Sequence, residues 1–134
     1  MLRRTLVFVA AIIVLSLSSC GGSGDSLKQV QQQRSGEYTV TIMSDSGTMK
    51  HGASTFTLEF RKADGGQLVD VGTVEVSPIM EMSGMAPMMA SAEAKPSGVT
   101  GRYTVSGNLT MAGMWKMNVK FGGGQSVRFS VNAE

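Results

Sequence analysis

The feature that most constrains this fold is an alternation of apolar and polar side chains with a period of two, which begins at Tyr38 and recurs in short runs. Successive side chains of a β-strand point to opposite faces, so this period predicts strands with one buried face. Seven such segments can be traced, at 38–42, 56–60, 69–76, 90–95, 103–109, 115–121 and 127–131. Seven short strands without a helical period predict an all-β fold, a seven-stranded immunoglobulin-like β-sandwich, with a small barrel as the alternative.

Glycine-rich turns separate these runs. Asp64, Gly65 and Gly66 divide the second run from the third, and three glycines at 122–124 join the last two. In the third run the apolar residues that would face inward change from odd-numbered to even-numbered positions around Gly72. This change predicts a β-bulge there.

The N-terminal residues have the charged, apolar and small-residue zones of a secretory signal: Arg3 and Arg4, an apolar run over 6–17, and two serines before Cys20. The apolar run is too short to span a bilayer. The end of this segment resembles the lipobox of bacterial lipoproteins, in which the cysteine is acylated and becomes the mature N-terminus; an ordinary secretory signal is the alternative. We therefore expect a signal peptide over 1–19, a lipidated Cys20 with a flexible linker over 20–36, and one domain over 37–134.

The net charge and the cysteine content limit the possible functions and the cellular location of the chain. The 12 basic and 10 acidic residues give +2, and loss of Arg3 and Arg4 with the signal leaves 10 of each and a net charge of zero. Without a block of like charges, the chain has no nucleic-acid-binding character. Cys20 is the only cysteine, so the exported domain must fold without a disulfide. We expect it outside the cytoplasm, anchored to membrane lipid in the cell envelope, on the periplasmic side in a Gram-negative cell.

Methionine is the unusual component. Of 11 methionines, all but Met1, Met43 and Met49 lie between Met80 and Met117. One group follows the third run in a segment broken by glycine and proline, and a second lies between the fifth and sixth runs. Because consecutive antiparallel strands reverse direction, alternate connections share one end of a sandwich, so we expect both groups and the only histidine at the same end.

Thioether sulfur is a soft, neutral ligand that favours Cu(I), and unlike a thiol it forms no disulfide outside the cytoplasm. Glu81 would offset part of the positive charge of the metal. Met117 alternates in phase with the core residues Trp115 and Val119, so we assign it to the core. The candidate Cu(I) ligands are Met80, Met82, Met85, Met88, Met89, Met111, Met114 and His51. Met-rich loops also serve as adaptable docking surfaces, so a non-metal interaction module that docks onto a membrane protein is the alternative. A further alternative is that the exposed methionines act as sacrificial oxidant sinks.

No enzyme motif occurs in the sequence. The lone cysteine is expected to be acylated, no histidine pair is present for zinc, and no glycine-rich phosphate loop follows a strand. We therefore predict that the chain is not an enzyme.

A set of short segments from Gly52 to Phe121 resembles the YtkA-like and FixH-like group of exported bacterial β-domains. They are residues 56–60, 78–89, 101–103 and 111–115. The resemblance implies an immunoglobulin-like sandwich and an association with copper efflux or oxidase copper supply, with Met80, Met82, Met111 and Met114 at the family's methionine segments. The chain lacks the histidine that some relatives have in the methionine loop, and the membrane helix of FixH-type members. We therefore expect an independent lipoprotein that exchanges Cu(I) with a copper transporter or efflux component.

Overall fold

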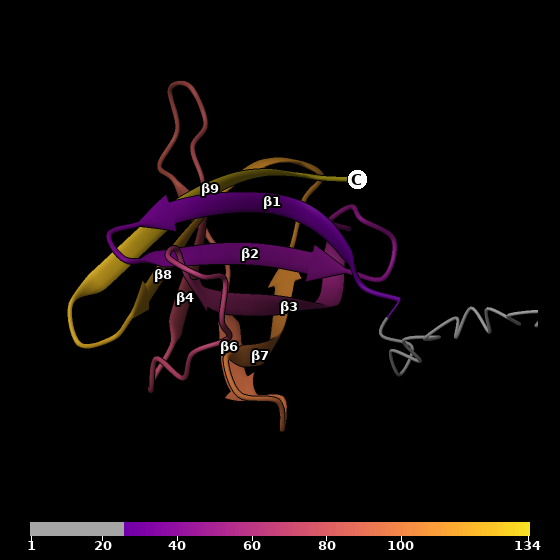
Figure 1. The fold of residues 1–134 in the computed structure, drawn as a ribbon. Coiled ribbons are helices and arrows are strands. Elements are labelled where there is room, and N and C mark those ends of the chain that lie inside the picture. Colours follow the sequence, from indigo (N-terminus) through magenta and orange to yellow (C-terminus); the bar gives the residue numbers. More distant parts are fainter. Residues whose placement is uncertain (1–25) are drawn as a thin grey trace, which may run out of the picture.

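The structure is a computed structural model that describes residues 26–134, which form nine β-strands in two antiparallel sheets (Figure 1). The strands are β1 (Lys28–Ser35), β2 (Tyr38–Ser44), β3 (Gly52–Lys62), β4 (Glu75–Met80), β5 (Met88–Met89), β6 (Ala92–Pro96), β7 (Arg102–Leu109), β8 (Gly113–Phe121) and β9 (Gln125–Ala133). One sheet has the order β1-β2-β3-β7-β6 and the other β5-β4-β8-β9. The predicted all-β sandwich is confirmed, with nine strands instead of seven. Residues 26–134 contain no helix with the length and apolarity needed to cross a bilayer.

The core lies between the two sheets and follows the alternation of the sequence. Ile42, Leu58 and Phe60 point inward from the larger sheet, and Trp115 and Phe129 point inward from the smaller one. The indole Nε1 of Trp115 donates a hydrogen bond to the Met111 carbonyl at 2.9 Å, which satisfies the polar atom of this buried ring. Met117 is also completely buried, as its position in the alternating pattern predicted.

Strand β1 corrects the expected linker over 20–36. Lys28–Ser35 pairs with β2 from Lys28 opposite Ser44 to Ser35 opposite Tyr38, so the linker prediction is wrong for these residues. The other side of β1 lies against β9, where the Ser35 hydroxyl donates to the Ser126 carbonyl at 2.9 Å. Main-chain pairing needs no apolar side chains, and Val30 is the one apolar residue of this glutamine-rich edge strand that packs on the core. The strand therefore has no apolar period to detect.

The expected strand over 69–76 is also displaced. Residues 69–74 form no ladder, and the strand instead runs from Glu75 to Met80. Residues 63–74 cross from one sheet to the other, and Val71 and Val74 are buried on the way without strand pairing. The shift of the apolar positions near Gly72 therefore reflects this crossing between the sheets, and the predicted β-bulge is absent from these residues. The crossing is held by the Tyr103 hydroxyl, which lies 3.0 Å from Asp70 Oδ1 and 2.9 Å from the Gly72 carbonyl.

The connections divide between two ends of the sandwich. Loops 45–51, 81–87 and 110–112 lie at the end that also carries Glu134, and we call this the methionine end. The connections 36–37, 63–74, 97–101 and 122–124 lie at the other, which we call the far end. Hydrogen bonds link the far-end connections, from the Ala63 N–H to the Glu37 carbonyl at 2.8 Å and from the Gly122 N–H to the Val71 carbonyl at 3.2 Å. In Figure 1 the loop after β4 projects beyond the body of the sandwich at the top.

Candidate functional site

Met80 belongs to the core at the methionine end. It is the last residue of β4, is 7% exposed, and pairs with Met88 of β5. Its side chain reaches the start of β8, because a Cβ added at Gly113 would lie 3.1 Å from Met80 Cε. Met49 is buried as well, at the bridge between loop 45–51 and Ala133. These two thioethers therefore fill space between the sheets.

Three other methionines form a partly open group, which we call the methionine rim: Met82, Met88 and Met111. The Thr110 hydroxyl donates to Met88 Sδ at 3.0 Å, so the end of loop 81–87 meets the turn between β7 and β8. Met111 follows Thr110 directly and is 45% exposed, whereas Met82 and Met88 are half-buried against the core. The structure thus brings the two methionine groups of the sequence together through Thr110, which has no signal in the sequence.

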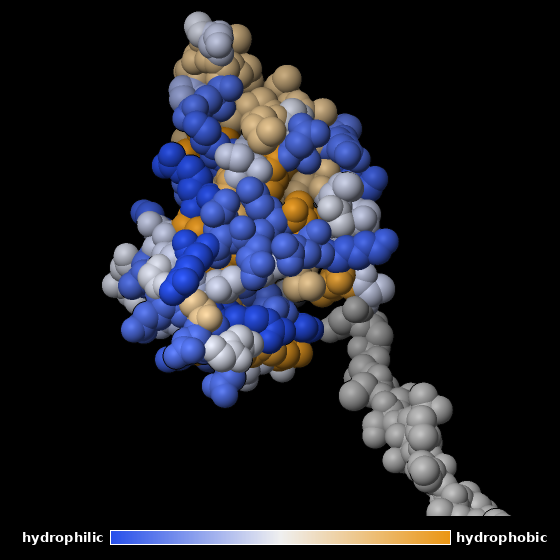
Figure 2. Space-filling view, turned by 45° about the horizontal axis from the view of Figure 1, so that its top comes forward, coloured by the Kyte–Doolittle hydropathy of each residue, from blue (hydrophilic) through white to orange (hydrophobic). Residues whose placement is uncertain are grey.

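The remaining candidate methionines are the most exposed. Met85 lies in loop 81–87 with 69% exposure, and Met89 and Met114 lie on the outer face of the smaller sheet with 72% and 56% exposure. Apolar surface gathers accordingly at the top of the molecule, where that loop projects (Figure 2). On the same outer face the Glu81 carboxylate accepts a hydrogen bond from Lys116 Nζ at 2.6 Å. This hydrogen bond and the charge of Lys116 lower the pKa of Glu81, so the carboxylate already has a cationic partner.

His51 lies beside Glu134 at the methionine end. It is exposed, and both its main-chain N–H and its ring Nδ1 contact the main-chain oxygen of Glu134, at 2.9 and 2.6 Å. When Nδ1 carries the donated proton, Nε2 keeps its lone pair and is able to bind a metal. The next residue, Gly52, pairs with Leu109, so His51 lies beside the turn that carries Thr110. The structure places this histidine at the predicted end.

The donors at the methionine end suit a soft metal. Within residues 26–134, no three side chains of the His, Cys, Asp or Glu type form a metal-binding group. The donors that the rim offers are neutral thioethers, and three of the four strongly exposed methionines flank it. Neutral sulfur donors fit Cu(I) better than any hard cation.

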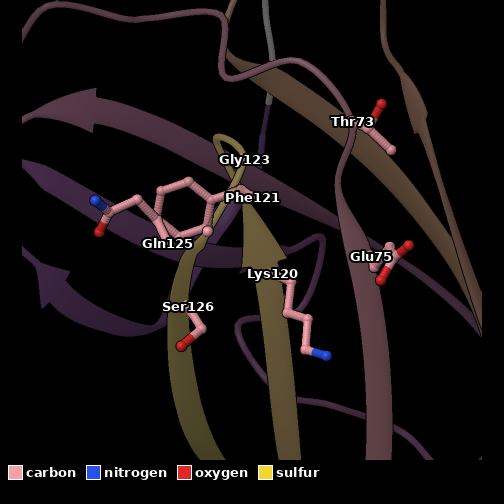
Figure 3. A pocket seen from close by; sticks show the side chains of 8 residues that line it. Thr73, Glu75, Lys120, Phe121, Gly123, Gln125 and Ser126 are labelled. Atoms are coloured by element: carbon pink, nitrogen blue, oxygen red, sulfur yellow. The ribbon is translucent and has the colours of Figure 1, made fainter.

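Two hollows lie away from these methionines. One, of about 470 Å³, lies beside the glycine turn of the far end, where Glu75 of β4 and Lys120 of β8 occupy opposed positions and Gln125 and Ser126 follow from β9 (Figure 3). The other, of about 560 Å³, lies between residues 70–74 and 94–103. Neither is lined by methionine, histidine or cysteine.

The fold and the rim define a small antiparallel β-sandwich that carries exposed and half-buried thioethers at one end. The chain belongs to the YtkA-like family, whose model matches residues 32–120. The match runs from within β1 to the end of β8 and includes both methionine groups of the sequence. Comparison with curated proteins gave no match. Cys20 and the signal peptide predicted over 1–19 lie outside the described residues.

Proposed function

We propose that this chain is a lipid-anchored protein of the cell envelope that binds Cu(I) through thioethers at its methionine end and exchanges it with a membrane transporter or efflux component. The observation that carries the proposal is the meeting of two sequence-distant methionine groups at Thr110, with Met82, Met88 and Met111 half-buried or exposed. Methionines that only filled space would be enclosed, as Met80 and Met117 are.

The eight candidate ligands differ in how accessible they are to solvent. Met80 is enclosed in the core, so binding through its sulfur would require the start of β8 to open. Met82, Met88 and Met111 are half-buried or exposed on the framework, and Met85 lies in the loop that projects after β4. Met89 and Met114 on the outer face and His51 beside Glu134 are outlying donors that take part in capture or release.

Thioether coordination suits the exchange of a metal between proteins. A thioether carries no proton to lose, so metal affinity depends little on pH, in contrast to cysteine and histidine sites. Neutral ligands also leave the metal its positive charge, which favours transfer to a partner with anionic donors. The anchor at Cys20 would keep this exchange at the membrane, where a transporter resides.

The test is an anaerobic Cu(I) titration of the purified protein against a competing chelator. We expect stoichiometric uptake, and we expect the combined variant Met82→Leu, Met85→Leu, Met88→Leu, Met111→Leu to bind about tenfold or more weakly, because leucine keeps the apolar volume and removes the sulfur. The matched control is Met43→Leu with Met117→Leu, which removes two sulfurs that are not among the candidate ligands and leaves uptake unchanged. Absence of uptake by the parent protein, or equal uptake by both variants, overturns the proposal.

The same variants separate metal binding from docking. A docking surface depends on shape and apolarity, which leucine preserves, so a non-metal interaction module would retain its partner in the fourfold variant. Lipidation is measured separately, by mass spectrometry of the protein extracted from bacterial membranes, as an added mass on Cys20.

A further inference from the structure

One side-chain hydrogen bond connects the two methionine groups of the methionine end. The Thr110 hydroxyl donates to Met88 Sδ at 3.0 Å, across 22 residues of sequence. Met88 begins β5, where it pairs with Met80 of β4 at the edge of the smaller sheet. Thr110 begins the turn that leads from β7 of the larger sheet to β8 of the smaller one. The bond therefore joins an edge strand of one sheet to a turn between the two sheets.

The turn that carries Thr110 is itself held in place. Leu109, the residue before it, is 1% exposed and ends β7 in the core. Met111, the residue after it, accepts a hydrogen bond on its carbonyl oxygen from Nε1 of the completely buried Trp115, at 2.9 Å. Because the residues on both sides are fixed, Thr110 presents its hydroxyl from a defined position, although its own side chain is exposed.

Met88 is a flexible side chain that a metal would otherwise have to order on binding. Methionine has three rotatable side-chain bonds, and fixing them costs conformational entropy. Met88 is half-buried, so packing does not enclose it as it encloses Met80. The hydroxyl of Thr110 engages one lone pair of the sulfur and leaves the second for a metal. Part of the ordering has therefore already taken place in the metal-free protein.

The same hydrogen bond also withdraws electron density from the sulfur, which by itself would weaken coordination. The two effects on Met88 have opposite signs, and a weak hydrogen bond to a thioether withdraws little charge. We therefore expect the ordering of the side chain to dominate. The hydroxyl oxygen of Thr110 is a hard donor and a poor ligand for Cu(I), so its contribution is made through Met88.

We propose that Thr110 is a positioning residue of the copper site, which holds Met88 Sδ next to the turn of Met111 before the metal arrives. The proposal rests on the proposed function for the metal, whereas the hydrogen bond that carries it is present without copper. A ligand side chain that is already ordered binds more tightly than one that must be ordered on binding. Thr110 therefore raises the affinity for Cu(I) without contacting the metal.

The test measures Cu(I) affinity anaerobically against a competing chelator in the parent protein and in three variants of it. Thr110→Val removes the hydroxyl and keeps the branched shape, Thr110→Ser keeps the hydroxyl, and Thr55→Val removes a hydroxyl from an exposed position of β3. We expect Thr110→Val to bind about threefold to tenfold more weakly, the range that the loss of one hydrogen bond typically produces. Thr110→Ser and the matched control Thr55→Val should retain the affinity of the parent protein.

Double-mutant cycles show whether Thr110 acts through Met88. In the Met88→Leu background, Thr110→Val should have no further effect on Cu(I) affinity, because the acceptor sulfur is gone. In the Met111→Leu background, it should weaken binding by the same factor as in the parent protein. An equal loss in every background assigns the effect to the fold of the turn and overturns the positioning role.

A metal-free measurement separates this proposal from the proposed function. With isotope-labelled methionine methyl groups, and with Met88→Leu to identify the signal, NMR relaxation should show a more mobile Met88 methyl group in Thr110→Val than in the parent protein or in Thr110→Ser. Unchanged mobility, or Cu(I) binding by Thr110→Val that equals or exceeds that of the parent protein, overturns the positioning role alone. Failure of the parent protein to take up Cu(I) overturns the proposed function, and the positioning role with it.

Discussion

Gly101 offers the sharpest test of the framework that positions β4 and the methionine loop. This buried glycine has a φ of +80°, and a Cβ added there would lie 2.9 Å from the Phe60 carbonyl oxygen and from both the main-chain nitrogen and the carbonyl oxygen of Val69. The Gly101 carbonyl also accepts a hydrogen bond from the Phe60 N–H at 2.8 Å. The close approach joins β3 to the crossing segment that leads into β4.

The cost of Gly101→Ala has two separable parts. A non-glycine residue in the left-handed region costs about 1–2 kcal/mol. Overpacking costs about 1–3 kcal/mol more, because all three contacts are main-chain atoms that no rotamer change removes. The sum of about 2–5 kcal/mol is a large part of the 5–15 kcal/mol that typically stabilises a domain. For a domain of this size we expect the midpoint of thermal unfolding to fall by roughly 8–20 °C.

Thermal unfolding followed by circular dichroism measures this loss, and Gly98→Ala is the matched control. Gly98 lies in the same connection with a φ of +93°, but a Cβ there would meet no atom within 4 Å. We expect this variant to lose only the backbone part, about 1–2 kcal/mol. If the two variants lose the same stability, the close packing of Gly101 against β3 and the crossing segment contributes nothing, and the reasoning is refuted.

Three further predictions follow from the same structure. Tyr103→Phe removes the hydroxyl that contacts Asp70 and Gly72, and we expect urea denaturation to show a loss of about 1 kcal/mol. Burial alone would raise the pKa of Glu59, but hydrogen bonds from two arginines outweigh it and lower the pKa. Its stabilising contribution is therefore full above the unfolded pKa near 4.5 and is lost as pH falls through the lower folded pKa, so Glu59→Gln should flatten the stability curve on the acid side of pH 4.5. Met117→Leu, a volume-conserving change in the core, should cost less than about 1.5 kcal/mol in the same urea assay.

The sequence predicted the strands that bury one face. Phe56, Leu58 and Phe60 face the core from β3, and Trp115 and Val119 face it from β8, because the hydrophobic effect imposes the period of two on any strand with one dry face. Alternation carries no information about segments whose stability comes from main-chain pairing. Strand β1 was missed for this reason, and residues 69–74 were assigned to a strand because burial during a crossing resembles burial in a sheet.

The candidate site was predictable in its location and not in its detail. Strand reversal places the methionine loops at one end, and the structure agrees on that placement. Which sulfurs are open to solvent depends on contacts that the sequence does not reveal. Met80 is enclosed because Gly113 leaves room for its methyl group, and Met88 stays at the rim because Thr110 donates to its sulfur. Gly113 lies within a segment that carries the family resemblance, but nothing in that segment indicates its contact with Met80.

Strand β1, which the sequence did not predict, changes the place at which the preceding chain enters the sandwich. A linker ending at residue 36 would join the domain at Tyr38, at the far end. Strand β1 instead runs the length of the sandwich, so the chain enters at Lys28, next to loop 45–51. A glutamine-rich edge strand with one buried valine therefore decides at which end of the sandwich the chain enters the domain.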